Sequence, residues 1–322
     1  MKKTLTLGID TSNYTTSMAV FDTERLEVIA NLKAPLDVKE GERGLRQSDA
    51  LFAHIKNLPE ISERIREYYS YESLAAIGVS AKPRDEEGSY MPCFLAGRAA
   101  AYTLASGGAP IYEFSHQAGH VAAALWNSGR RELMGSEFIA LHVSGGTTEL
   151  LLVKPNQASF DISLIGGTLD INAGQLIDRV GVMMGLKFPC GPALEVLAGE
   201  FVNAGGRCSL TQSVSISEDG VNLSGAENKA RTALDRGFPR GEVAQFTLEF
   251  VAKNLDALTH LAKDKYGELP VLYAGGVMSN TYIKDYLARR HDAAFAPPEY
   301  SSDNAAGVAV LAGLNFLKQR EA

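Results

Sequence analysis

A duplicated strand–turn–strand pattern is the feature that most constrains the fold of this chain. Residues 4–22 (TLTLGIDTSNYTTSMAVFD) run through apolar residues to Asp10, turn through polar residues and become apolar again. Residues 137–155 (EFIALHVSGGTTELLLVKP) repeat this layout around a Ser-Gly-Gly-Thr-Thr turn. Two apolar runs separated by turn residues predict a strand, a tight turn and a returning strand. The repetition therefore predicts that one βββαβα-type lobe occurs twice in the chain.

Amphipathic helices and buried strands alternate between and after the two hairpins. We expect strands at 74–80 and 269–276 and helices at 44–70, 94–107, 171–186, 243–267, 280–290 and 302–320. This alternation indicates an α/β protein. A chain of 322 residues is long for one hydrophobic core, so two lobes are expected. We place them at 1–113 and 114–322, with the last helix (about 303–320) packing back at the lobe junction.

Composition narrows the environment and the class of ligand. The net charge of −7 argues against a broad nucleic-acid-binding face, although a local basic patch or a basic partner subunit is compatible with it. The start MKKTLTLGID lacks a long apolar region, and no run of eighteen apolar residues follows, so we expect a cytoplasmic protein without membrane insertion. Cys93, Cys190 and Cys208 form no CxxC pair, which favours reduced thiols.

Glycine pairs follow three apolar runs, at residues 145–146, 166–167 and 275–276. Backbone without Cβ atoms can approach a phosphate closely and direct N–H groups at its oxygens. Two lobes that each offer a hairpin turn to phosphates are the layout of the actin and sugar-kinase ATPase superfamily. That fold has two RNase H-like lobes with a nucleotide and metal cleft between them. Asp10 lies where the superfamily keeps an acidic group, and we consider it a candidate catalytic acid/base or water-positioning residue.

Two histidines stand four positions apart in the stretch SHQAGHVAAAL. On a helix, His116 and His120 would share one face and could bind the same ion. The spacing alone fits core or surface histidines equally well. Near the other end of the chain, Ser302 and Asp303 precede the last helix and could act as its N-cap.

Seven motifs in order carry a resemblance to one family. The sequence resembles the tRNA N6-adenosine threonylcarbamoyltransferase catalytic subunit family, formerly named O-sialoglycoprotein endopeptidases, over nearly its whole length. The motifs are GIDTSNYTTS, HQAGH, VSGGTTEL, GGTLDINAGQLIDRVGVMMGLKFPCGP, LSGAENKA, AGGVMSN and SSDNAAGVA.

The resemblance implies a metal site. Its HxxxH pair matches His116 and His120, and its late Asp matches Asp303; in the family these hold one divalent metal ion, iron or zinc. As a donor set, imidazoles with a carboxylate would also suit manganese, so the metal's identity stays open. Some members place a metal-binding Tyr two residues before the Ser of VSGG, where this chain has His142. We hypothesise that His142 is a further ligand, the alternative being a buried structural histidine.

The resemblance also implies a site for an adenine nucleotide, which could be ATP, ADP, AMP or an acyl-adenylate. The matching positions are expected to contact its phosphate, ribose and adenine. They are His142, Val143, Ser144, Gly145, Gly146, Asp178, Gly191, Glu195 and Asn280.

The implied activity is a metal-dependent acyl transfer. A threonylcarbamoyl or carbamoyl group would pass from an adenylate to an acceptor, with adenosine of tRNA as the inherited acceptor and AMP as the leaving group. Protein partner subunits are expected on the same grounds. Peptidase activity is not expected, because Gln117 stands where the HExxH zinc peptidases have a Glu.

Several departures from the family pattern surround the expected cleft. Tyr14 and Thr15 replace an acidic pair, Thr147 replaces a His, and Cys190 replaces a Gly. A charged segment, residues 79–95 (VSAKPRDEEGSYMPCFL), replaces a glycine turn. The chain is therefore interpreted as a divergent paralogue. Transfer to another acceptor, or a nucleotide-binding scaffold without turnover, stay open as alternatives.

Overall fold

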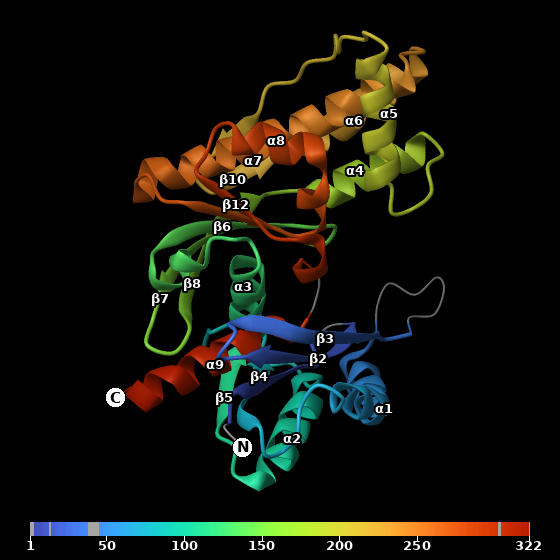
Figure 1. Ribbon diagram of the computed structural model, residues 1–322. Helices are drawn as coiled ribbons and strands as arrows, with labels where there is room; N and C mark the ends of the chain where they lie inside the picture. Colours follow the sequence, from blue (N-terminus) through green and yellow to red (C-terminus); the bar gives the residue numbers. More distant parts are fainter. Residues whose placement is uncertain (1–2, 13, 38–44, 302–303, 322) are drawn as a thin grey trace. The chain divides into compact units, whose positions relative to one another are not determined.

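The computed structural model describes residues 3–12, 14–37, 45–301 and 304–321 (Figure 1). Contacts divide the chain into two compact units. Unit 1 comprises Met1–Met134, Pro155–Asp161 and Glu299–Ala322, and unit 2 comprises Gly135–Lys154 and Ile162–Pro298. This division differs from the predicted lobe limits of 1–113 and 114–322, because the segment up to Met134 and the last helix belong to the compact N-terminal unit.

Unit 1 contains a five-stranded sheet in the order β3-β2-β1-β4-β5. The antiparallel part consists of β1 (Leu5–Asp10), β2 (Thr15–Asp22) and β3 (Glu27–Pro35). On the other side of β1, β4 (Leu74–Lys82) and β5 (Ile111–Ser115) run parallel to it. The carboxyl ends of these three parallel strands therefore meet at one edge of the sheet.

Helices cover both faces of the unit 1 sheet. Leu7 and Ile9 of β1 share a core with α1 (Gln47–Ile65) and α2 (Phe94–Leu104). Successive side chains of a strand point to opposite faces, so Gly8 faces the other layer. That layer contains α3 (His116–Trp126) and α9 (Ala306–Glu321), which pack against each other and against β4 (Figure 1).

Two glycines allow α9 to lie close to its neighbours. A Cβ on Gly8 would stand 2.2 Å from the carbonyl oxygen of Ala305, and one on Gly307 would stand 1.8 Å from that of Gly119. Real Cβ atoms do not approach backbone oxygen so closely. The sequence positions of these glycines thus fix how α9 packs on β1 and on α3.

Unit 2 contains a seven-stranded sheet in the order β12-β11-β6-β7-β8-β10-β9. Its hairpin is β6 (Phe138–Val143) and β7 (Thr148–Pro155), paired antiparallel. The remaining strands are β8 (Phe160–Thr168), β9 (Ser215–Ser217), β10 (Gly220–Asn222), β11 (Val271–Ala274) and β12 (Ala293–Phe295).

The core of unit 2 lies between this sheet and a layer of helices. These are α4 (Ala173–Met183), α5 (Gly191–Asn203), α6 (Ser224–Asp235), α7 (Arg240–Tyr266) and α8 (Thr281–Ala288). The long helix α7 is buried along much of its length and contributes residues such as Phe250 and Leu258 to the core. Over the described ranges, no helix is both long and apolar enough to cross a membrane.

The strand order confirms the predicted duplication. Unit 1 has the order β3-β2-β1-β4-β5, and unit 2 repeats it as β8-β7-β6-β11-β12. In unit 2, β10 and β9 extend the sheet beyond β8. Several of the expected helix limits differ from the observed ones, and two of the helices are clearly shorter than expected. The helix expected at 44–70 ends at Ile65, and that expected at 94–107 ends at Leu104 and continues as a 3₁₀ turn.

One of the three glycine pairs was assigned wrongly to a turn. Gly166 and Gly167 lie inside β8. A Cβ on Gly167 would stand 2.4 Å from the carbonyl oxygen of Thr148. The pair therefore permits close packing of strands, a use of glycine that the sequence does not distinguish from a phosphate turn.

Candidate metal and nucleotide sites

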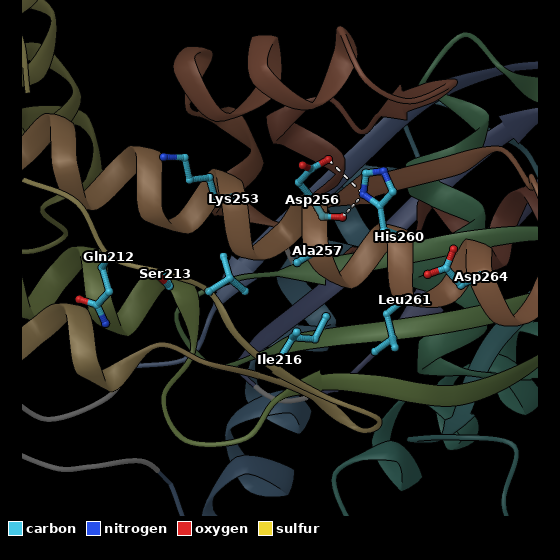
Figure 2. Close-up of a pocket in the computed structure, with 10 residues that line it drawn as sticks. Gln212, Ser213, Ile216, Lys253, Asp256, Ala257, His260, Leu261 and Asp264 are labelled. Carbon is cyan, nitrogen blue, oxygen red and sulfur yellow. Dashed lines mark hydrogen bonds and ion pairs between the residues drawn. The ribbon is translucent and has the colours of Figure 1, made fainter.

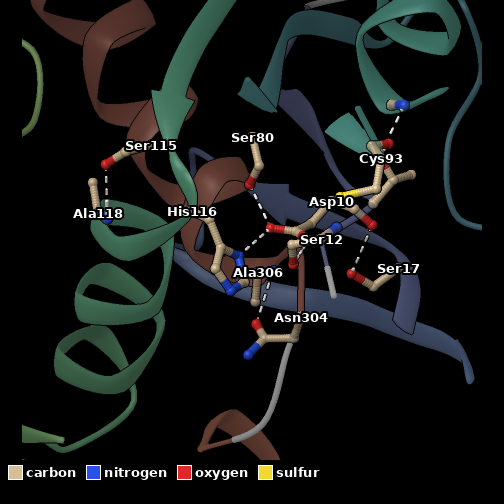
Figure 3. A network of polar contacts seen from close by, with 12 residues as sticks. Asp10, Ser12, Ser17, Ser80, Cys93, Ser115, His116, Ala118, Asn304 and Ala306 are labelled. Carbon is tan, nitrogen blue, oxygen red and sulfur yellow. Dashed lines mark hydrogen bonds and ion pairs between the residues drawn. The ribbon is translucent and has the colours of Figure 1, made fainter. Parts of the chain in front are cut away.

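Asp10 is the centre of a buried polar network in unit 1 (Figure 3). It ends β1, and its Oδ1 accepts hydrogen bonds from the backbone N–H of Ser12 (2.8 Å) and from the Ser12 hydroxyl. Its Oδ2 accepts a hydrogen bond from Ser80, near the end of β4, and lies 2.8 Å from Nδ1 of His116. The network thus joins residues at the carboxyl ends of β1 and β4 with the helix that follows β5.

The charge state of Asp10 follows from these contacts. Burial by itself raises the pKa of Asp10, but the charge and hydrogen bond of His116 and the bonds from Ser12 and Ser80 hold the pKa below its ordinary value. An ionised carboxylate can only accept hydrogen bonds, so the Nδ1 of His116 must be the donor.

His116 and His120 both stand on α3, as predicted. Their ring centroids are 4.2 Å apart with an interplanar angle of 73°. The hydroxyl of Ser115 caps the helix by accepting from the N–H of Ala118 at 3.2 Å, which fixes where the first turn begins. The helix therefore brings the two imidazoles together on one face.

The residues present fit a metal site of the expected kind. A metal-binding histidine commonly donates its second ring N–H to a carboxylate, which fixes the tautomer and the ring orientation. The contact from His116 Nδ1 to Asp10 has this form and assigns Nε2 as the atom that would bind an ion. The third expected ligand, Asp303, lies outside the described residues. The predicted N-cap Ser302 lies outside them too. Among the described residues before α9, Asn304 accepts through its Oδ1 from the N–H of Ala306 at 3.0 Å.

The Ser144–Thr147 turn of unit 2 packs against the first turn of α4. The N–H of Gly174 donates to the carbonyl oxygen of Ser144 at 3.2 Å, and the N–H of Ala173 donates to the hydroxyl of Thr148 at 2.9 Å. A Cβ on Gly174 would stand 2.7 Å from the backbone of Gly145. The glycine turn thus lies directly against the N-terminus of α4 and, with Thr148, accepts hydrogen bonds from its first N–H groups.

Within the turn, two N–H groups are already used. The hydroxyl of Ser144 accepts from Gly146 N–H at 3.2 Å and from Thr147 N–H at 3.0 Å. Gly145 and Gly146 are exposed. Because the N–H of Gly146 is directed at Ser144, a phosphate that uses this donor would have to replace the hydroxyl.

The other predicted nucleotide residues of unit 2 form two pairs. Asp178 accepts from the N–H of Cys190 at 2.7 Å and thereby holds the residue before Gly191, where α5 begins. Glu195 accepts from the N–H of Thr281 at 2.7 Å, beside Asn280, whose side chain caps α8 by accepting from Ile283 at 3.0 Å. Both carboxylates therefore organise backbone at helix starts.

Three further residues of interest are His142, Gly275 and Cys190. His142 is the last residue but one of β6, before Val143, and is half-buried; its roles in metal and nucleotide binding stay predictions. Gly275, after β11, has a φ of 102° and lies against Val143, since a Cβ there would stand 2.2 Å from the Val143 carbonyl oxygen. Burial, and then the charge of Asp178, raise the pKa of the Cys190 thiol, which disfavours a reactive thiolate.

Sequence reasoning missed the residues that surround Asp10. Ser12 reaches Asp10 from two positions along the chain, whereas Ser80 reaches it only through the pairing of β1 with β4. The available signal for Ser80 was a polar residue directly after a buried apolar run.

Comparison with solved structures defines the class of the fold. The activator of the 2-hydroxyisocaproyl-CoA dehydratase from Clostridium difficile matches 98% of this chain and 97% of its own, with a TM-score of 0.52 and 15% identity. HypF from T. kodakarensis matches 98% of this chain and 47% of its own, with a TM-score of 0.57 and 13% identity. The chain has the actin-like/sugar-kinase ATPase fold, as the sequence predicted.

Sequence comparison places the chain within that class. The family model for tRNA N6-adenosine threonylcarbamoyltransferase matches residues 27–310. The enzyme of that name from Thermus thermophilus is 31% identical over 97% of this chain and 92% of its own. The one from Sulfurihydrogenibium sp. is 30% identical over 94% and 88%. The chain therefore belongs to the tRNA N6-adenosine threonylcarbamoyltransferase family, a family of transferases.

Proposed function

We propose that this chain transfers a threonylcarbamoyl group from an adenylate to N6 of an adenosine in tRNA. Membership of the family supports the reaction class, and the observation that carries the proposal is the Asp10–His116–His120 cluster in unit 1. This cluster contains the two expected histidine ligands and a carboxylate, that of Asp10, which orients His116. A scaffold without turnover would have no need of such an arrangement.

In the proposed reaction, the exocyclic nitrogen of adenosine attacks the carbonyl carbon of the carbamoyl–phosphate anhydride. A carbon–nitrogen bond forms, the bond from carbon to the phosphate oxygen breaks, and AMP leaves with the electron pair. The nitrogen releases one proton to solvent or to a basic group. The activated anhydride supplies the driving force, so the chain need not provide a nucleophile.

The residues of unit 1 would hold a divalent metal ion, iron or zinc, through His116 and His120, with Asp303 as the expected third ligand. When bound, such an ion supplies positive charge that polarises an oxygen of the adenylate. Asp10 keeps the ring of His116 in one orientation and one tautomer. We assign it this positioning role in the proposal; the acid/base role stays a sequence-based prediction.

The residues of unit 2 would bind the adenine nucleotide. The Ser144–Thr147 turn would bind phosphate through its backbone N–H groups, with that of Gly146 exchanging the Ser144 hydroxyl for a phosphate oxygen. The N–H groups of Ala173 and Gly174 hold the turn against α4. Asp178 and Glu195 would present carboxylates to ribose or adenine, and each already fixes a helix start. tRNA, the adenylate and partner proteins are the expected interaction partners.

Mass spectrometry of nucleosides tests the proposal. The chain is incubated with threonine, bicarbonate, ATP, a tRNA transcript and an acyl-adenylate-forming protein, and digested tRNA is analysed for threonylcarbamoyladenosine. We expect the product with the native chain and with Gln117→Ala, and its loss with His116→Gln. If no modified adenosine forms where the Thermus thermophilus relative produces it, tRNA is not the acceptor.

A further inference from the structure

A second group of metal-binding side chains lies in unit 2, apart from the residues predicted by the family motifs. Asp256 and His260 stand one turn apart on α7, and His291 lies shortly before β12. One possible ligand atom from each residue lies within 4.8 Å of the other two. These residues lie in none of the seven family motifs.

The distances suit ligands of one ion. Nε2 of His291 is 2.8 Å from Oδ1 of Asp256, and Nδ1 of His260 is 3.5 Å from the same oxygen. Two ligands about 2.0–2.1 Å from a tetrahedral Zn²⁺ are roughly 3.3 Å apart. A small rotation of the exposed His260 side chain and a slight opening of the Asp256–His291 pair would therefore bring the three atoms to coordination distance.

The backbone holds the three residues in place. The N–H of His291 donates to the carbonyl oxygen of Leu287 at 3.1 Å, at the end of α8. Nδ1 of His260 lies 2.9 Å from the carbonyl oxygen of Asp256, a contact that an ion bound at Nδ1 would replace. The rings of His260 and His291 have centroids 5.1 Å apart. His291 is therefore held in place before an ion binds, and His260 is the ligand that has to reorient.

Neighbouring cations do not neutralise Asp256 at close range. Arg290 Nε lies 4.0 Å from Asp256 Oδ2, the limit of an ion pair. Two nearby lysines have acidic partners of their own. Lys253 pairs with Glu249 at 2.6 Å, and Lys263 pairs with Glu268 at 2.8 Å. The Asp256 carboxylate thus has its shortest polar side-chain contact with His291.

Asp256 and His260 line a surface pocket of about 560 Å³ (Figure 2). Asp264 also lines it from α7, and Gln212 and Ile216 are among the residues that line the other side. The His291 side chain is only 1% exposed, whereas that of His260 is 59% exposed. One buried and one exposed imidazole would let an ion enter from the pocket and keep a coordination position directed toward it.

We propose that Asp256, His260 and His291 bind one Zn²⁺ ion at the edge of this pocket. Two imidazoles and one carboxylate are a donor set that zinc accepts, and three protein ligands leave room for water or a small anion. The ion would tie the end of α8 and the start of β12 to α7. This site is independent of the proposed transfer reaction and of the His116–His120 pair.

The test is zinc binding in a protein that lacks the first site. In the full chain carrying His116→Gln and His120→Gln, we measure Zn²⁺ stoichiometry and affinity by competition with a chromophoric chelator. One equivalent of Zn²⁺ is expected to remain, with His260→Gln weakening its binding by at least about tenfold, the loss seen on disturbing metal-site residues. Asp264→Asn removes a carboxylate from the same helix and pocket and should leave the affinity unchanged.

Two results would overturn the proposal: no Zn²⁺ bound in the double variant, or bound Zn²⁺ that His260→Gln does not affect. Because His260 is exposed, its substitution should be tolerated, and circular dichroism verifies that each variant is folded. A second readout is the visible spectrum of the Co²⁺-loaded protein, whose tetrahedral bands should disappear in His260→Gln and persist in Asp264→Asn.

Discussion

Oδ2 of Asp10 lies 2.8 Å from Nδ1 of His116, although 106 positions separate the two residues in sequence. The contact exists because β1 and β5 end at the same edge of one sheet, with β4 between them. This contact fixes the orientation of the His116 ring beside His120 on α3. The carboxylate of Asp10 is buried, so it bonds to the surrounding protein groups and not to water.

Asp10→Asn should weaken metal binding without removing a ligand. The amide carries no charge to stabilise the donor N–H of His116, and loss of such a partner typically costs about 10- to 100-fold in metal affinity. Chelator competition with Zn²⁺ or Fe²⁺ measures this change. The reading is wrong if Asp10→Asn binds metal as tightly as the native chain while remaining folded.

Ser17→Ala serves as the control for this prediction. The Ser17 hydroxyl donates to the backbone oxygen of Asp10 at 3.4 Å and not to its carboxylate, so its removal leaves the carboxylate and His116 in place. Metal affinity should be unchanged in this variant. A similar loss in both variants would indicate a general effect on the sheet.

Gly8→Ala should strongly destabilise unit 1. The added Cβ would stand 2.2 Å from the carbonyl oxygen of Ala305, so α9 or β1 must move. Overpacking in a core costs about 1–3 kcal/mol, and a clash with backbone should reach the upper part of that range. Urea unfolding measures the loss, with Gly107→Ala as control because no heavy atom lies within 4 Å of its added Cβ. Equal stability of the two variants would contradict the packing described for α9.

The repeated strand order was predictable from the sequence because each hairpin carries its own local signal. Apolar runs ending at Asp10 and Val143, each followed by a polar turn, needed no long-range information. The His116–His120 pair was likewise predictable, since helical spacing places residues four apart on one face. What the spacing could not show was the partner, Asp10, which reaches the pair only through the sheet.

Other features depend on contacts between distant segments and left no local signal. Gly167 looks like a turn glycine in sequence, yet it permits close approach of β7. His291 joins Asp256 and His260 only because β12 pairs with β11 beside α7, and a lone histidine before a short strand indicates nothing by itself. The two carboxylates Asp178 and Glu195 were identified by family resemblance, whereas their hydrogen bonds to the starts of helices are seen only in the structure.

Gly174→Ala should weaken binding of adenine nucleotide. Its Cβ would stand 2.7 Å from the backbone of Gly145, so the Ser144–Thr147 turn and α4 must separate. Displacing backbone donors should reduce affinity by about tenfold, equivalent to about 1.4 kcal/mol. Isothermal titration with ATP or AMP gives the measurement.

Gly199→Ala is the matched control for Gly174→Ala. Both glycines are helical, but no heavy atom lies within 4 Å of a Cβ added to Gly199. This variant should bind nucleotide like the native chain and gain slightly in stability, because Ala favours helix over Gly by about 1 kcal/mol. Equal affinities in the two variants would remove the Ser144–Thr147 turn from the proposed phosphate site.

Asp170→Asn should destabilise unit 2 at neutral pH and have little effect in acid. Asp170 accepts from the N–H groups of Leu223 and Ser224 at 2.8 and 2.9 Å, and so ties β8 to the start of α6. Burial raises the pKa of Asp170, but these bonds and that of Ile171 together hold it below its ordinary value of 3.8. A lowered pKa in the folded state means that the stabilisation is fully present above 3.8 and is lost as the pH falls through the folded value.

Because the side chain of Asp170 is exposed, we expect Asp170→Asn to lose only about 1 kcal/mol of stability at pH 7. Urea midpoints of the native chain and the variant are measured from pH 7 to pH 3 and should converge as the pH falls. A difference that persists or grows in acid would show that the charge of Asp170 does not hold β8 to the start of α6.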